Sequence, residues 1–125
     1  MSFEKLDALC RRLNALEHAT AILHADEATA MAVGGGEARA EAMSILAGMY
    51  HRQATAPEIG DWLEAADNDD LSDDQHRAVR EFRRVWTGLT CLPPEFVERQ
   101  TVTRMRCEQL WRDLRAKNDW AGFQP

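Results

Sequence analysis

The sequence predicts an all-α protein, with about five helices packed as an irregular antiparallel bundle. Three observations favour this class: apolar residues recur at three- and four-residue spacings, strictly alternating apolar and polar runs are absent, and glycines and prolines separate the periodic segments. The chain has 125 residues, of which 45% are hydrophobic and 29% charged, as is typical of one globular domain. We therefore expect residues 1–125 to form a single helical domain.

The first expected helix runs from Phe3 to about Met31, with Ser2 as its N-cap. The triplet Gly34–Gly36 supplies the permissive backbone of a turn, and a second helix is expected over Glu37–Gln53. The side chains expected on the buried faces are Leu6, Leu9, Leu13, Leu16, Thr20, Leu23 and Ala30 in the first helix, and Ala42, Met43, Leu46, Met49 and Tyr50 in the second.

Pro57 suits the first turn of a third, shorter helix, and the acidic residues 67–74 that follow are expected to form a solvated loop. A capping box formed by Ser72 and Gln75 predicts a fourth helix over Asp73–Leu89, and the next prolines begin a fifth over Pro94–Lys117. A sixth helix is not expected, because too few residues follow a cap at Asn118 or Asp119. The expected inward side chains are Ile59, Trp62, Leu63 and Ala66, then Val79, Phe82, Trp86 and Leu89, then Val97, Thr101, Cys107 or Glu108, Trp111 and Leu114.

The net charge of −6 argues against a general nucleic-acid binder, although residues 1–75 carry −10 and residues 76–125 carry +4. We interpret this opposition of charge as a reason for the two halves to pack against each other, and we prefer this interpretation to a basic functional patch. Arg77, Arg80 and Arg84 share a helix face, which we interpret as solvated or ion-paired. No apolar segment resembles a secretory leader or a bilayer span, so we expect a cytoplasmic protein without membrane or nucleic-acid partners.

The sequence contains no pattern that predicts catalysis or metal binding by this chain alone. It lacks the HExxH motif of zinc peptidases and the paired ExxH motifs of di-iron bundles, and its acidic run lacks the Gly and Glu of a calcium loop. Cys10, Cys91 and Cys107 form no CxxC pair, which favours a reducing compartment and buried structural thiols. We expect no catalytic, cofactor-binding or metal-ligating residue here.

Polar residues interrupt the expected core at a few positions. Thr20, Glu27 and Thr101 fall where an apolar residue is expected, and buried polar groups require partners. Asp26 and Arg39 flank the glycine turn. We predict that they pair across it as a structural latch at the helix corner, which fixes how the first two helices meet.

Residues 25–39 resemble a segment near the amino terminus of the Taq-type zinc metallocarboxypeptidases. That segment holds a Trp-Asp pair, a Thr, a Met, two prolines, paired glycines and an Arg in this order. The matching residues are Asp26, Thr29, Met31, Gly34, Gly35 and Arg39, and residues 107–115 and 118–125 resemble a second family block. Ala25, Ala32 and Val33 depart from the pattern and leave the corner less bulky and less rigid. Loss of the large aromatic costs about 3 kcal/mol unless neighbours refill the gap.

The resemblance implies the front part of a mostly helical zincin with a deep groove, whose HExxH helix and further Glu ligand lie beyond the end of this sequence. The whole enzyme would use zinc or another divalent metal to release C-terminal residues from peptides, and these helices would form part of the groove wall or lid. This chain would not catalyse hydrolysis by itself. The alternatives are a stand-alone truncated paralogue that acts as an interaction module, or a small metal-binding bundle.

The end of the chain bears on the expected partners. Trp120 and Phe123 would normally anchor a helix against a neighbour, so apolar surface is expected to remain exposed there. We therefore expect either a homo-oligomer or association with the missing catalytic domain, and a peptide substrate only in the context of the full-length enzyme.

Overall fold

The computed structural model describes residues 1–124 and contains helices but no strand in that range, as the sequence predicts. The five expected helices are present, with ends that differ by a few residues. A short helix that the sequence analysis did not expect follows them. The elements are α1 (Ser2–Thr29), a 3₁₀ turn η1 (Val33–Gly35), α2 (Gly36–Ala54), α3 (Glu58–Ala66), α4 (Asp73–Thr90), α5 (Pro94–Ala116) and α6 (Trp120–Phe123).

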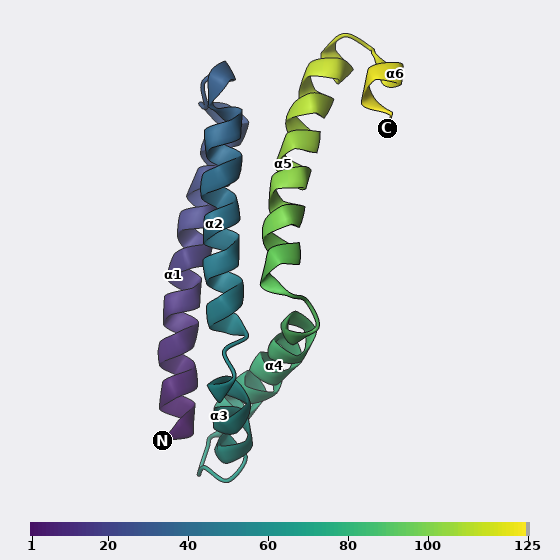
Figure 1. Ribbon diagram of the computed structural model, residues 1–125. Helices are drawn as coiled ribbons and strands as arrows, with labels where there is room; N and C mark the ends of the chain where they lie inside the picture. The colour runs from purple at the N-terminus through teal and green to yellow at the C-terminus, as the bar shows by residue number, and fades with distance from the viewer. Residues whose placement is uncertain (125) are drawn as a thin grey trace.

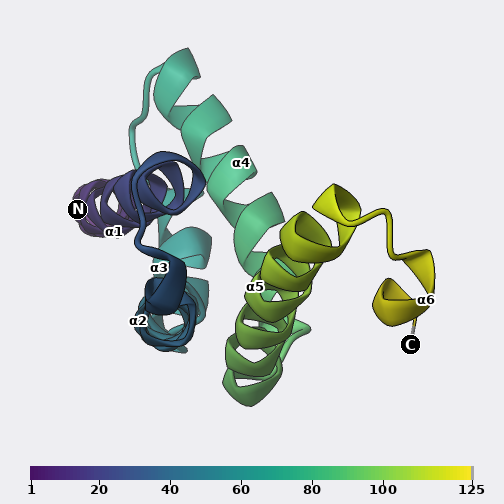
Figure 2. The same cartoon turned by 90° about the horizontal axis from the view of Figure 1, so that it is seen from above.

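Helices α1, α2 and α5 run along the length of the molecule, with α2 in the middle (Figure 1). Helices α3 and α4 close the end where the chain begins, and α6 lies at the opposite end beside the last turn of α5 (Figure 1). Seen from above, α4 diverges from α5 (Figure 2). None of the described helices combines the length and the low polarity needed to cross a membrane.

The larger part of the core lies where α1, α3 and α4 meet the end of α2. Buried residues of this cluster are Leu6, Leu9, Leu13, Ala54, Ile59, Leu63, Ala66 and Val79. Phe82, Trp86 and Leu89 of α4 pack against it, as their helical spacing predicts. On α1 the expected stripe is correct as far as Leu23, but Ala30 is exposed because α1 ends at Thr29.

Part of the acidic run caps and fastens helices, so its expected role as a solvated loop is wrong in part. The backbone amides of Ser2 and Phe3 both donate to Asp69 Oδ2, at 3.1 and 3.2 Å, and Met1 rather than Ser2 is the N-cap of α1. Asp67 pairs with Arg83 at 2.7 Å. The expected capping box of α4 is present, with the Ser72 amide donating to Gln75 Oε1 at 2.8 Å. The contacts of Asp69 and of the capping box satisfy amides at helix starts, whereas the Asp67–Arg83 pair links the loop to α4.

The buried face of α2 differs from the expected one in part: Met43 is buried and Leu46 and Tyr50 are half-buried, as expected. Ala42 and Met49 are exposed, whereas Gly36, Ala40, Met43, Gly48, His51 and Ala54 are buried. The reason is that α2 contacts both α1 and α5, so small residues face the second partner. A Cβ atom at Gly48 would overlap the Glu98 side chain of α5, which shows how closely these two helices approach.

The second half of α5 buries the face that its sequence predicts only in part: Thr101, Glu108 and Leu114 are half-buried as expected. Met105 is buried against Ala40 and Met43, whereas Cys107 and Trp111 are exposed. The face of α5 that meets α2 runs through Thr101, Met105 and Glu108, and Trp111 lies on the side of α5 where α6 packs, which leaves it 41% exposed. The two thiols at Cys91 and Cys107 are exposed and Cys10 is half-buried, so the expectation of buried cysteines is wrong.

Candidate functional site

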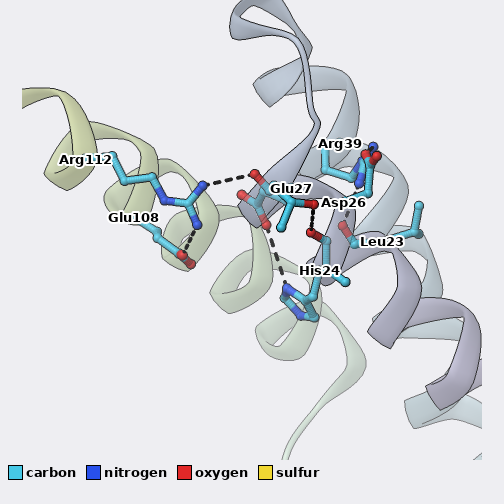
Figure 3. Close-up of polar contacts among 9 residues, drawn as sticks. Leu23, His24, Asp26, Glu27, Arg39, Glu108 and Arg112 are labelled. Atoms are coloured by element: carbon cyan, nitrogen blue, oxygen red, sulfur yellow. Dashed lines mark hydrogen bonds and ion pairs between the residues drawn. The ribbon is translucent and has the colours of Figure 1, made fainter.

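The corner where α1 turns into α2 gathers most of the polar residues that the sequence singles out. Asp26 and Arg39 form an ion pair there, and the second amino group of Arg39 donates to the Leu23 backbone oxygen at 2.6 Å (Figure 3). The Arg39 side chain is only 17% exposed, whereas that of Asp26 is 42% exposed. The structure therefore brings the two residues of the predicted latch together. Their role in fixing the helix angle remains a prediction.

Glu27, the next residue, carries a buried carboxylate. Its side chain is 2% exposed, its Oε2 atom lies 3.7 Å from His24 Nδ1, and its Oε1 atom has no hydrogen-bond partner among residues 1–124. Burying an incompletely paired carboxylate costs free energy, so this position stabilises the fold less than an apolar residue would. By contrast, the hydroxyls of Thr20 and Thr101 each donate to the backbone oxygen four residues earlier, at 2.9 Å, and are satisfied within their own helices.

Helix α5 reaches the same corner through Arg112 and Glu108. Arg112 donates from one nitrogen to the Glu27 backbone oxygen at 3.1 Å and from the other to Glu108 Oε1 at 2.6 Å (Figure 3). We name the six residues of this arrangement the corner cluster: His24, Asp26, Glu27, Arg39, Glu108 and Arg112. The sequence analysis missed Arg112, and it offered Glu108 only as an alternative inward residue of the fifth helix, without a place at this corner. Their spacing of four residues signals only a local pair, since the contact with Glu27 spans 85 residues.

The two arginines of the corner cluster act on the same end of α1. The last turn of α1 has no basic residue of its own, although helix C-termini favour positive charge and leave backbone oxygens without intrahelical partners. Arg112 supplies a donor to the Glu27 backbone oxygen in that turn, and Arg39 brings a second positive charge to the Leu23 backbone oxygen one turn earlier. The corner cluster therefore joins α1, α2 and α5 through one helix terminus.

An open hollow of about 510 Å³ lies beside this corner, between α2 and α5. Arg106 forms a two-bond ion pair with Glu37 across it, at 2.8 and 3.1 Å. The guanidinium lowers the pKa of the Glu37 carboxyl, chiefly through these hydrogen bonds. Ile45 and Val102 give the hollow an apolar side, and Glu41 adds a second acidic group.

A second hollow, of about 310 Å³, lies between α1, α2 and α4 and is lined mainly by apolar side chains. Burial, with a smaller effect of Asp7, raises the pKa of the Cys10 thiol in this hollow. Burial and the neighbouring Glu17 likewise raise the pKa of Tyr50. Raised pKa values keep both groups protonated at neutral pH, so Cys10 is not an activated nucleophile.

No metal centre is assembled by residues 1–124. Within that range, no three His, Cys, Asp or Glu side chains lie close enough together to hold a metal ion. The side chains of the corner cluster consequently do not fit a catalytic zinc, and we assign them no step in peptide hydrolysis.

Comparison with solved structures identifies the class of protein to which this helical path belongs. A crystal structure of BsuCP superposes with a TM-score of 0.90 at 22% identity, over 98% of this chain and 25% of the other. Trypanosoma cruzi metallocarboxypeptidase 1 superposes with a TM-score of 0.77 at 36% identity, over the same shares. The fold is that of a segment of the helical metallocarboxypeptidases.

Sequence comparison then identifies the family. The sequence model of the carboxypeptidase Taq (M32) metallopeptidases matches residues 5–125, and the chain belongs to this family. Thermostable carboxypeptidase 1 of Thermus thermophilus is 32% identical over 105 residues, which cover 80% of this chain and 20% of that protein. Thermostable carboxypeptidase 1 of Pyrococcus furiosus is 26% identical over 125 residues, which cover 99% of this chain and 25% of that protein. The chain thus spans about a quarter or less of the length of these relatives, and the family resemblance inferred from its sequence is confirmed.

Proposed function

We propose that this chain acts as the amino-terminal helical segment of a metal-dependent carboxypeptidase, forms part of the wall or lid of the peptide groove, and does not hydrolyse peptides alone. The observation that carries the proposal is its 36% identity to Trypanosoma cruzi metallocarboxypeptidase 1 over 98% of its length, matched by only 25% of that protein. The metal of the whole enzyme supplies the activation of water in such peptidases. The role of this segment is to position helices.

The hollow between α2 and α5 supports a place in the groove wall. It is open to solvent and is lined by residues of α2 and α5, the two helices that Arg39 and Arg112 of the corner cluster tie to α1. A groove wall has to be stiff to select peptides, since binding energy is lost when a surface must be ordered on binding. The close packing of α2 on α5 through buried small residues of α2 supports such stiffness.

The assay for this function is release of C-terminal residues from blocked peptides by the purified chain, with and without added zinc. We expect no turnover in either condition. Turnover that a chelator abolishes would overturn the proposal, because it would require a set of metal ligands within this chain. We also propose that the protein works in the cytoplasm, supported by its three free cysteines.

A second candidate function is a helical interaction module that binds a protein partner or a second copy of itself. The exposed large apolar side chains, among them Ile22, Val33 and Trp120, favour this candidate. Sedimentation of the chain at high concentration tests self-association. A dimer or larger species supports it, and a compact monomer contradicts it.

A further inference from the structure

A hollow of about 280 Å³ lies between α1 and α3, at the end of the molecule where the chain begins (Figure 1). Leu9 is its buried member, and Trp62 is half-buried and packs against the core beside it. Lys5, Ala8 and Arg12, all exposed, complete the lining. We name these five residues the α1–α3 hollow. It combines an apolar base with two positive charges.

The four α1 residues of the hollow lie on one face of the helix, because side chains three, four and seven positions apart are neighbours there. Lys5 and Arg12 are two turns apart, which places their Cα atoms about 10 Å from each other at 1.5 Å per residue. Ala8 and Leu9 lie between them. Along α1 the hollow therefore presents a positive, an apolar and a second positive position.

The two cations of the hollow have no ionic partner among residues 1–124. Five Lys and Arg residues occur in residues 1–75, and three of them, Arg11, Arg39 and Arg52, form ion pairs. The two without an ion pair, Lys5 and Arg12, line the same hollow. Acidic residues are abundant in this half of the chain, but none lies three or four positions from either cation on α1. The missing pairs are thus a consequence of the sequence and not of a shortage of carboxylates.

Trp62 contributes to the environment of these charges. The Lys5 ammonium lies 5.7 Å from the centre of the Trp62 ring. A cation–π contact of this kind uses none of the three N–H donors of the ammonium group. Lys5 therefore keeps its hydrogen-bonding capacity for an anion while it lies over an apolar surface.

We propose that the α1–α3 hollow binds an extended acidic peptide segment of a partner protein, in which two carboxylates flank one apolar side chain. In an extended chain, alternate residues share a face and rise about 3.3 Å each, so carboxylates four positions apart are about 13 Å apart. The long side chains of Lys5 and Arg12 span the small difference from their own spacing. The apolar side chain between the carboxylates then meets Leu9 and Trp62.

The charge of the surroundings selects a short acidic peptide over a nucleic acid. Residues 1–75 carry a charge of −10, so a long polyanion is repelled outside the hollow, whereas two carboxylates need to reach only the two cations. This binding role goes beyond the proposed function, because the hollow lies at the opposite end of α1 from the corner cluster.

Nuclear magnetic resonance of the isotope-labelled chain tests the proposal, with the acetylated and amidated pentapeptide Glu-Ala-Leu-Ala-Glu as the probe. We expect the peptide to shift the backbone amide signals of Ala8 and Leu9 and the indole N–H signal of Trp62. The peptide Gln-Ala-Leu-Ala-Gln should bind at least about fivefold more weakly, since one exposed ion pair contributes up to about this factor. Equal affinities of the two peptides, or no shift at these signals, would overturn the proposal.

Two variants of adjacent residues provide a matched control. Arg12→Gln removes a cation of the hollow, and Arg11→Gln removes the same charge from a side chain that is 80% exposed, pairs with Asp7 and does not line the hollow. Arg12→Gln should weaken binding of the acidic peptide by about threefold or more, and Arg11→Gln by less than about twofold. Equal weakening by both variants would show an effect of net charge alone and would contradict a site at the hollow.

Two further titrations separate the other occupants. Inorganic phosphate that shifts the same signals at the concentrations at which the peptide does would refute a peptide site, because the hollow would then bind any anion. Shifts at Ala8, Leu9 and Trp62 on dilution of the chain alone would identify a second copy as the occupant and would also refute it. Signals that respond to neither support the acidic peptide.

Discussion

The ion pair between Asp26 and Arg39 should couple α1 to α2 measurably, and a double-mutant cycle of Asp26→Asn and Arg39→Met isolates that coupling. Arg39 is 17% exposed and also donates to the Leu23 backbone oxygen at 2.6 Å. Hydrogen bonds to charged groups contribute about 1.5–3 kcal/mol, so Arg39→Met should lower the free energy of unfolding by about 2 kcal/mol. Asp26 is 42% exposed, and solvent screening reduces the pairwise coupling to about 1 kcal/mol.

Urea unfolding followed by circular dichroism measures each free energy, and a second pair on α1 serves as the control. Asp7 and Arg11 lie 2.9 Å apart but are 44% and 80% exposed, so the cycle of Asp7→Asn and Arg11→Met should give at most about 0.5 kcal/mol. A coupling between Asp26 and Arg39 no larger than that of the control would refute the latch. So would an Arg39→Met variant as stable as Arg11→Met.

Four further outcomes are expected. Glu27→Met should raise the free energy of unfolding by about 1 kcal/mol, because one oxygen of the buried carboxylate has no hydrogen-bond partner among residues 1–124. A decrease of similar size in the free energy measured by urea unfolding would contradict this. Gly88→Ala should stabilise the protein by about 0.5–1 kcal/mol, because the new Cβ has open space and alanine favours a helix more than glycine does. Gly48→Ala should give no such stabilisation, because the new Cβ displaces Glu98 from Arg52. Equal melting temperatures of the two variants would argue against close packing of α2 on α5. Asp69→Ala should cost about 1 kcal/mol in thermal unfolding, because the Ser2 and Phe3 amides lose their cap, and an unchanged melting temperature would contradict that. Arg106 lowers the pKa of the Glu37 carboxyl from its ordinary value of 4.5. The ion pair therefore contributes to stability above pH 4.5, and this contribution is lost as the pH falls through the lowered pKa. Glu37→Gln should flatten this part of the acid unfolding profile, and an unaltered profile would count against the pair.

Local signals in the sequence predicted most of the fold. Helix α4 begins where its capping box places it, because Ser72 and Gln75 satisfy each other within one turn. The stripe of α1 through Leu6, Leu9 and Leu13 is buried as its spacing predicts. Such features depend only on residues that are close in sequence, so they can be predicted from one amino-acid sequence.

Features that depend on distant partners were not predictable in this way. The buried face of α2 follows from its position between α1 and α5, which the spacing of its own apolar residues does not encode. Arg112 contacts the Glu27 backbone oxygen, and a backbone acceptor leaves no mark on sequence. Asp69 belongs to a run of acidic residues that are similar in sequence, and only the path of the chain decides that Asp69 caps α1.

The sequence predicted less of the candidate site than of the fold. Asp26 and Arg39 were recognisable because they flank a glycine turn that brings consecutive helices together. Glu27 was recognisable as a polar residue on an apolar stripe, although its incomplete pairing with His24 was not. The exposure of Trp111 depends on which helices surround α5, so its spacing gave the wrong face.

The most direct test of the account uses a chimera in which this chain replaces the matched quarter of Trypanosoma cruzi metallocarboxypeptidase 1. The rate at which this chimera releases C-terminal residues is compared with the rate of the same enzyme from which the matched quarter has been deleted. If this chain supplies the helical segment of a carboxypeptidase, the chimera hydrolyses peptides and the deleted enzyme does not. A folded chimera as inactive as the deleted enzyme would contradict the account.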